Sequence, residues 1–136
     1  RGYNIDSLTV CATNNPEQSR MTIVVKGDEH ILDQIQKQLA KLEEVIAIKK
    51  CETSSSVQRE MSLIKVRAEA SNRGTIIETA DIYKARIVAV SLESVIIEIT
   101  GSEEKVESLL RLLEPYGILE YVRTGLTSLD RGSGVM

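Results

Sequence analysis

The side chains that could do chemistry in this sequence are few and far apart. The single histidine, His30, lies among acidic residues at the expected start of a helix, where acids complement the positive end of the helix dipole. The two cysteines, Cys11 and Cys51, lie in strand-like apolar runs and lack the spacing of metal ligands. We therefore interpret His30 as a solvated helix residue and expect no metal site.

The remaining candidates for catalysis also have simpler interpretations. The pairs Glu43–Glu44 and Glu103–Glu104 fall at expected helix ends, where solvated acids are common. Ser54–Ser56 reads as a flexible joint, and the sequence contains no phosphate-binding loop or dinucleotide fingerprint. The sequence predicts a chain that is not itself an enzyme and holds no cofactor of its own.

Composition limits the class of protein. The 136 residues are 42% hydrophobic with no Trp or Phe, so one ordinary domain or two small ones would have an aliphatic core. A net charge of -3 provides no basic surface for nucleic acid. No apolar run is long enough to cross a membrane, and we expect no signal peptide in these residues. Two cysteines fit a reducing cytoplasm, although their spacing does not decide whether they form a disulfide.

The elements that would position these residues form two similar sets. The first half predicts a hairpin of strands 5–10 and 20–25, a helix over 31–42 and a strand at 45–48. The second half predicts six elements. They are, in order, a strand near 61–70, a helix near 76–83, strands at 87–90 and 95–99, a helix over 106–113 stopped by Pro115 and Gly117, and a strand at 118–123.

The two sets align as a repeat. Gly27 falls on Gly101 and Ile35 on Leu109, so the first half matches the last four elements of the second. Six elements of this kind make a ferredoxin-like βαββαβ domain. We predict an α+β fold of tandem ferredoxin-like domains, with an incomplete ββαβ domain over 1–52, a linker over 53–58 and a second domain over 59–136. The repeat predicts roughly twenty further residues upstream, which hold a strand and most of a helix. Without them, an apolar sheet face of the first domain should be exposed.

Several stretches carry a family resemblance. They are "RGYNIDSLTV", "SRMTIVVKGD", "ILDQIQKQLAKLEEV", "REMSLIKV", "ADIYKARIVAVS", "TGSEEKVESLLRLLEPYGILEYVRTG" and "LDRG". Together, and in this order, they resemble the small, regulatory subunit of acetohydroxyacid synthase, also called acetolactate synthase. The resemblance implies an N-terminal ACT domain, a ferredoxin-like amino-acid-binding module, followed by a C-terminal domain of related fold.

The resemblance also implies a role. Members of this family bind a large, thiamine-diphosphate-dependent catalytic subunit, raise its activity and confer feedback inhibition by branched-chain amino acids, usually valine. Thiamine diphosphate, magnesium and FAD would then belong to the large subunit. We expect a homodimer with no nucleic-acid or membrane partner, located in the cytoplasm, or in the plastid stroma if the source is a plant.

The resemblance places part of an effector site in this chain. It implies that Asn4 and Ile5 line one wall, where a carboxamide can bind both ends of an amino acid. The other wall would lie upstream, so we expect this chain to bind valine poorly. Asn4 could instead be a turn residue. The equivalent loop of the second domain, 70–74, is more consistent with an ordinary strand-to-helix turn than with a second effector site.

Two other functions are compatible with this fold. One is a stand-alone ACT-like amino-acid sensor or transcriptional regulator, although no DNA-binding segment is visible after Arg123. The other is a small enzyme of the acylphosphatase kind, which would need an anion-binding loop beside a catalytic Arg and Asn. Copurification with the large synthase subunit would separate all three.

Overall fold

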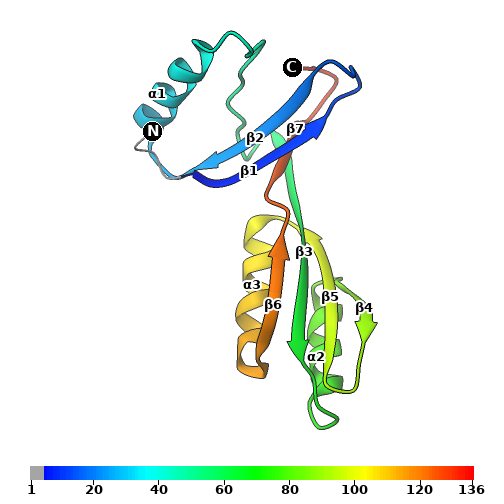
Figure 1. Ribbon diagram of the computed structural model, residues 1–136. Helices are drawn as coiled ribbons and strands as arrows, with labels where there is room; N and C mark the ends of the chain where they lie inside the picture. Colours follow the sequence, from blue (N-terminus) through cyan, green and yellow to red (C-terminus); the bar gives the residue numbers. More distant parts are fainter. Residues whose placement is uncertain (1–4) are drawn as a thin grey trace. The chain divides into compact units, whose positions relative to one another are not determined.

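A computed structural model describes residues 5–136, which divide into two compact units (Figure 1). The first unit ends at Gln58 and also includes Leu126–Met136, while the second unit is Arg59–Gly125. Within the described residues, no helix combines the length and the apolar character needed to cross a bilayer.

The second unit is a ferredoxin-like domain, as predicted. Its elements are β3 (Ser56–Arg67) from Arg59 onward, α2 (Arg73–Ile82), β4 (Arg86–Val90), β5 (Ser94–Gly101), α3 (Glu103–Leu113), the 3-10 turn η1 (Glu114–Tyr116) and β6 (Ile118–Arg123). The strands form an antiparallel sheet in the order β4-β5-β3-β6. The first and last strands of the unit are therefore neighbours, an arrangement that the βαββαβ topology requires.

Alternation along the strands and helical spacing build one aliphatic core in this unit. Ile64 of β3, Ile97 of β5, Ile76 of α2 and Leu109 of α3 are all fully buried in the same cluster. Because side chains alternate across a strand, the residues between them in β3 and β5 face the other side of the sheet. The helices predicted near 76–83 and over 106–113 therefore form, and each packs one face into this core.

Helix α3 shows how local sequence sets an element's limits. Ser102 is its N-cap, and its Oγ accepts a hydrogen bond of 3.2 Å from Lys105 N. At the other end, Pro115 lies in η1 and Gly117 has a φ of +101°, a conformation that favours glycine. The predicted stop at Pro115 and Gly117 is therefore correct.

The first unit contains the predicted hairpin and helix. Strands β1 (Ile5–Ala12) and β2 (Ser19–Val25) pair antiparallel, and α1 (Glu29–Ala40) follows after the N-cap Asp28, whose carboxylate accepts from Ile31 N at 3.0 Å. No side chain in residues 5–55 is buried. A two-stranded sheet with one helix buries too little apolar surface to form a core of its own.

The predicted strand at 45–48 is wrong, because these residues form no strand and Ile46 is 77% exposed. In the second unit the equivalent strand, β6, pairs with β3, the first strand of that unit. Between residue 5 and residue 48, the structure has no strand equivalent to β3 with which 45–48 could pair. A strand-like sequence pattern does not show whether another strand is available to pair with it.

The segments at both ends of the second unit also differ from expectation. The expected linker 53–58 is a turn only to Ser55, because Ser56 begins β3. Ser56 is buried, and its Oγ donates a hydrogen bond to Glu52 O at 2.6 Å. The second domain was expected to extend to 136, but Leu126–Met136 belong to the first unit.

Leu126–Met136 belong to the first unit because they contain a strand that the sequence did not indicate. Strand β7 (Thr127–Asp130) pairs with β3. Arg20 Nη2 donates to Ser128 O at 2.8 Å, Lys49 forms an ion pair with Asp130, and Arg131 N donates to Ser55 O at 2.9 Å. These contacts join the end of the described chain to the first unit.

Candidate functional site

The predicted effector residues lie at the start of the first unit. Asn4 lies outside the described residues. Ile5 is the first residue of β1, pairs with Val25 and is 58% exposed. The register shifts between Ile5 and Ser7, as in a β-bulge, which re-aims the side chains around it. Ile5 therefore presents an accessible aliphatic side chain at an irregular point of the strand.

The hairpin carries a further exposed apolar surface. Leu8 lies opposite Ile23 and Val10 lies opposite Met21, and directly paired residues share one face of a sheet. Leu8, Val10 and Met21 are each more than half exposed. We call the four residues Leu8, Val10, Met21 and Ile23 the hairpin face. Such an aliphatic surface suits contact with another apolar surface, and its exposure agrees with the sequence expectation.

The opposite face of the hairpin is polar and partly covered. Thr9 pairs with Thr22, and Cys11 pairs with Arg20, whose guanidinium donates to Ser128 O of β7. Cys11 is exposed, Cys51 is half-buried, and both are free thiols. The disulfide that the sequence left open is therefore not formed.

Gly27, just before α1, leaves space for the side chain of Ile31. A Cβ on this residue would lie 2.9 Å from Ile31 Cγ2, so only glycine fits without displacing that side chain. His30 is exposed, and its Nε2 lies 3.2 Å from the amide nitrogen of Gln34. Among residues 5–136, no three His, Cys, Asp or Glu side chains gather closely enough to hold a metal ion.

Charges gather near the same end of α1. Lys50 forms an ion pair with Glu29 in the first turn, and its Nζ lies 3.8 Å from Glu52. The hydrogen bond to Glu29 is the main cause that raises the pKa of Lys50 above its usual value, with the Glu29 and Glu52 charges adding to it. This pair ties the segment after the helix to its beginning.

The strand-to-helix loop of the second unit is occupied by its own side chains. Arg73 Nη2 donates to the carbonyl oxygens of Ala68, Ser91 and Leu92 at 3.0, 2.7 and 2.8 Å. Asn72 Oδ1 accepts from Glu69 N at 2.9 Å. The guanidinium thus joins the loop to the turn between β4 and β5. An internal cation takes the acceptors that a ligand's ammonium group would otherwise find there.

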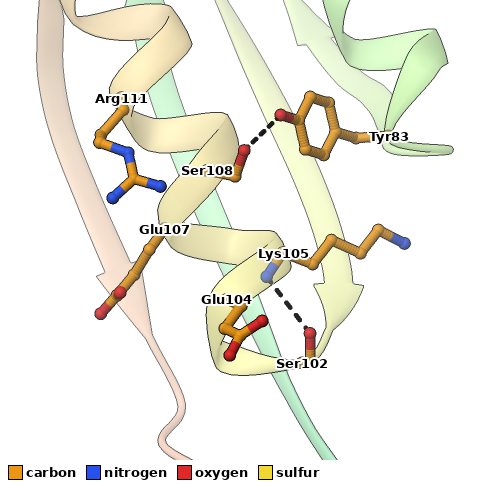
Figure 2. A pocket seen from close by; sticks show the side chains of 7 residues that line it. All are labelled: Tyr83, Ser102, Glu104, Lys105, Glu107, Ser108 and Arg111. Carbon is orange, nitrogen blue, oxygen red and sulfur yellow. Dashed lines mark hydrogen bonds between the residues drawn. The ribbon is translucent and has the colours of Figure 1, made fainter.

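A groove of about 590 Å³ lies along α3 and is also lined by Tyr83, the residue that follows α2. Figure 2 shows Tyr83 pointing across it to Ser108, with 2.5 Å between their oxygens. The other lining residues are Ser102, Glu104, Lys105, Glu107 and Arg111. Two acidic and two basic side chains give the groove no dominant charge. The Tyr83–Ser108 hydrogen bond joins the two helices, and sequence reasoning did not indicate it.

An ion pair with a buried carboxylate lies where β3 and β6 adjoin. Arg123 donates from Nε and Nη2 to the two carboxylate oxygens of Glu60, both at 2.7 Å, and the Glu60 side chain is only 2% exposed. Glu107 lies 3.7 Å from Arg123 Nη1. The hydrogen bond to Glu60 is the largest cause that raises the pKa of Arg123 above its usual value. No sequence spacing reveals this pair, because its members are far apart along the chain.

Comparison with known proteins covers both units. The profile described as "AHAS small subunit-like ACT domain" matches residues 1–47, and the profile described as "Small subunit of acetolactate synthase" matches residues 59–132.

Relatives match over almost the whole chain. The acetolactate synthase small subunit of Mycolicibacterium smegmatis is 54% identical over 97% of this chain and 78% of its own length. That of Mycobacterium leprae is 51% identical with the same coverage. The crystal structure of the acetolactate synthase small subunit from Thermotoga maritima matches with a TM-score of 0.87 and 39% identity, over 98% of this chain and 83% of that one. The chain therefore belongs to the acetolactate synthase small-subunit family.

Proposed function

We propose that this chain is a regulatory subunit that binds the catalytic subunit of acetolactate synthase, activates it and makes it sensitive to a branched-chain amino acid. The observation that carries the proposal is the continuous similarity of both units to proteins named as small subunits of this enzyme. The exposed hairpin face adds physical support, because a chain that leaves such a surface uncovered is suited to an assembly.

The proposed effector is valine, with leucine and isoleucine as competitors for the same site. Ile5 offers an accessible aliphatic side chain for the effector's own. Asn4, beside it in sequence, has a carboxamide that can accept from an ammonium and donate to a carboxylate. An effector that binds one assembly of subunits better than another shifts the balance between them by its difference in affinity.

In this proposal the small subunit acts as a homodimer and performs no chemistry. Thiamine diphosphate, magnesium and FAD are bound by the large subunit, which makes acetolactate in the cytoplasm. The hairpin face lies on a two-stranded sheet, and a second copy of the chain can cover it by apolar contact.

The test is reconstitution of the full-length chain with the large subunit from the same source. Acetolactate formation is measured with and without the small subunit, across concentrations of valine, leucine and isoleucine. We expect activation on mixing, and inhibition by one of the three amino acids. The matched variants are Ile5→Ser, which should weaken inhibition, and Asp6→Asn, an exposed neighbour that should not.

Two results would contradict the proposal. If the two subunits neither copurify nor change the rate of acetolactate formation, the regulatory role is wrong. If the isolated chain binds a branched-chain amino acid but ignores the large subunit, the protein is a stand-alone amino-acid sensor.

A further inference from the structure

Two stretches of backbone join the second unit to the first. One enters at Gln58–Arg59, within β3, and the other leaves at Gly125–Leu126, after β6. These two stretches are adjacent inside the second unit, because β3 and β6 are paired neighbours and Ser62 lies opposite Arg123. Any displacement that reaches the second unit through the backbone must therefore pass this point.

Two hydrogen bonds join the two stretches there. Met61 N donates to Thr124 Oγ1 at 3.0 Å, and Thr124 N donates to Met61 O at 3.0 Å. The bonds run in both directions between the same two residues. Relative sliding of the two stretches would break both bonds together.

Side chains add a stronger connection one residue away. Arg123 and Glu60 form two parallel hydrogen bonds of 2.7 Å, a forked geometry that fixes orientation as well as distance. Glu60 is buried, so its carboxylate has little access to water as an alternative partner. Separating the two strands would leave a buried charge without compensation.

We propose that Glu60 and Arg123, together with the Met61–Thr124 hydrogen bonds, form a clamp that makes the two connections move as one. The clamp would carry the effector-bound state of the first unit into the second unit. This inference rests on the proposed regulatory function and concerns how the regulation is transmitted. Glu60 and Arg123 are positioning residues in it and touch no substrate.

The chain supplies a matched control. Lys65 and Glu120 also lie opposite each other on β3 and β6, with 3.9 Å between their charged atoms, but further from the connections and largely exposed. The clamp variant is Glu60→Gln with Arg123→Met, and the control variant is Lys65→Met with Glu120→Gln. Arg123→Lys is a milder clamp variant that keeps the charge and the fold but loses the forked geometry.

The experiment uses the holoenzyme reconstituted from the full-length small subunit and the large subunit. We expect the clamp variant to activate as the unchanged protein does, while the valine concentration for half inhibition rises at least about fivefold, the lower end of typical coupling between sites. Hydrogen exchange at the Met61 and Thr124 amides should accelerate roughly tenfold. The control variant should change neither quantity. If the double variant does not fold, Arg123→Lys provides the same comparison with a smaller effect.

The inference is overturned if a folded clamp variant keeps the valine response of the unchanged holoenzyme. A different failure would point to the proposed function, namely an unchanged holoenzyme that does not respond to any branched-chain amino acid. In that case the clamp is judged by amide exchange alone, and protection at Met61 and Thr124 that is the same in the clamp variant would refute it.

Discussion

Replacing Arg73 by alanine should destabilise the second unit, because one guanidinium nitrogen holds three carbonyl oxygens there. Its three acceptors belong to Ala68, Ser91 and Leu92, at 2.7 to 3.0 Å. A guanidinium Nη2 has only two N–H groups, so one of them is shared between two acceptors. The arrangement therefore counts as two hydrogen bonds from a charged donor.

The magnitude follows from this count. A hydrogen bond to a charged group contributes about 1.5 to 3 kcal/mol. The Ser91 and Leu92 bonds are exposed, so water replaces part of the loss and each of the two bonds is discounted to about 1 kcal/mol. We expect Arg73→Ala to lower the free energy of unfolding by about 2 kcal/mol, close to a thirtyfold change in the folding equilibrium. For a unit of this size, the melting temperature should fall by roughly 8 °C or more.

The assay is urea and thermal unfolding of the full chain by circular dichroism, with hydrogen exchange at Ile64 and Ile97 to assign the change to the second unit. Arg86→Ala, an exposed arginine on β4, is the matched control and should cost less than about 0.5 kcal/mol. Millimolar guanidinium ion should partly restore the melting temperature of Arg73→Ala by entering the vacated position. If Arg73→Ala loses no more stability than Arg86→Ala, the three contacts of Arg73 do not stabilise the second unit as expected.

Three further changes test other parts of the structure. Leu109→Ala removes a fully buried side chain and should cost about 3 kcal/mol in urea unfolding, whereas the same change at the half-exposed Leu112 should cost far less. Ser102→Ala removes the N-cap hydrogen bond to Lys105 N and should cost about 1 kcal/mol, which substitution by Asp should largely restore. Val10→Glu places a charge on the hairpin face, so sedimentation velocity should show weaker self-association for this variant than for Thr9→Ser, which lies on the other face. Equal self-association of the two variants would argue against the hairpin face as a contact.

Sequence patterns predicted those parts of the fold that are set locally. The stripe of Val106, Leu109 and Leu113 is buried at helical spacing, and the chain stops its helix near Pro115 and Gly117. The hairpin of β1 and β2 follows from a cluster of turn formers between two strand-like runs. Each of these features depends on residues close together in sequence, so a single sequence is enough to indicate them.

Features that depend on distant partners were missed. Residues 45–48 have strand-like composition but no strand to pair with, and β7 exists because it pairs with β3 and because Arg20 holds Ser128. The contact of Glu60 with Arg123 likewise depends on strand register, which periodicity does not determine.

The candidate effector site was reached through family resemblance and only partly through physical pattern. The structure locates Ile5 at the exposed start of β1, whereas Asn4 lies outside the described residues. The Arg73 contacts were missed for another reason. A long side chain can reach several carbonyl groups of a folded turn, and the sequence does not indicate which of these groups it will reach.

The return of β7 to the first unit has a consequence for how the protein is made. A ribosome releases the hairpin before Arg59–Gly125, and it releases Leu126–Met136 after both. The second unit can therefore complete its core while the nascent chain is still growing. The hairpin, with Arg20 lacking its acceptor on Ser128, has to wait for Leu126–Met136, so a part synthesised before the second unit settles after it.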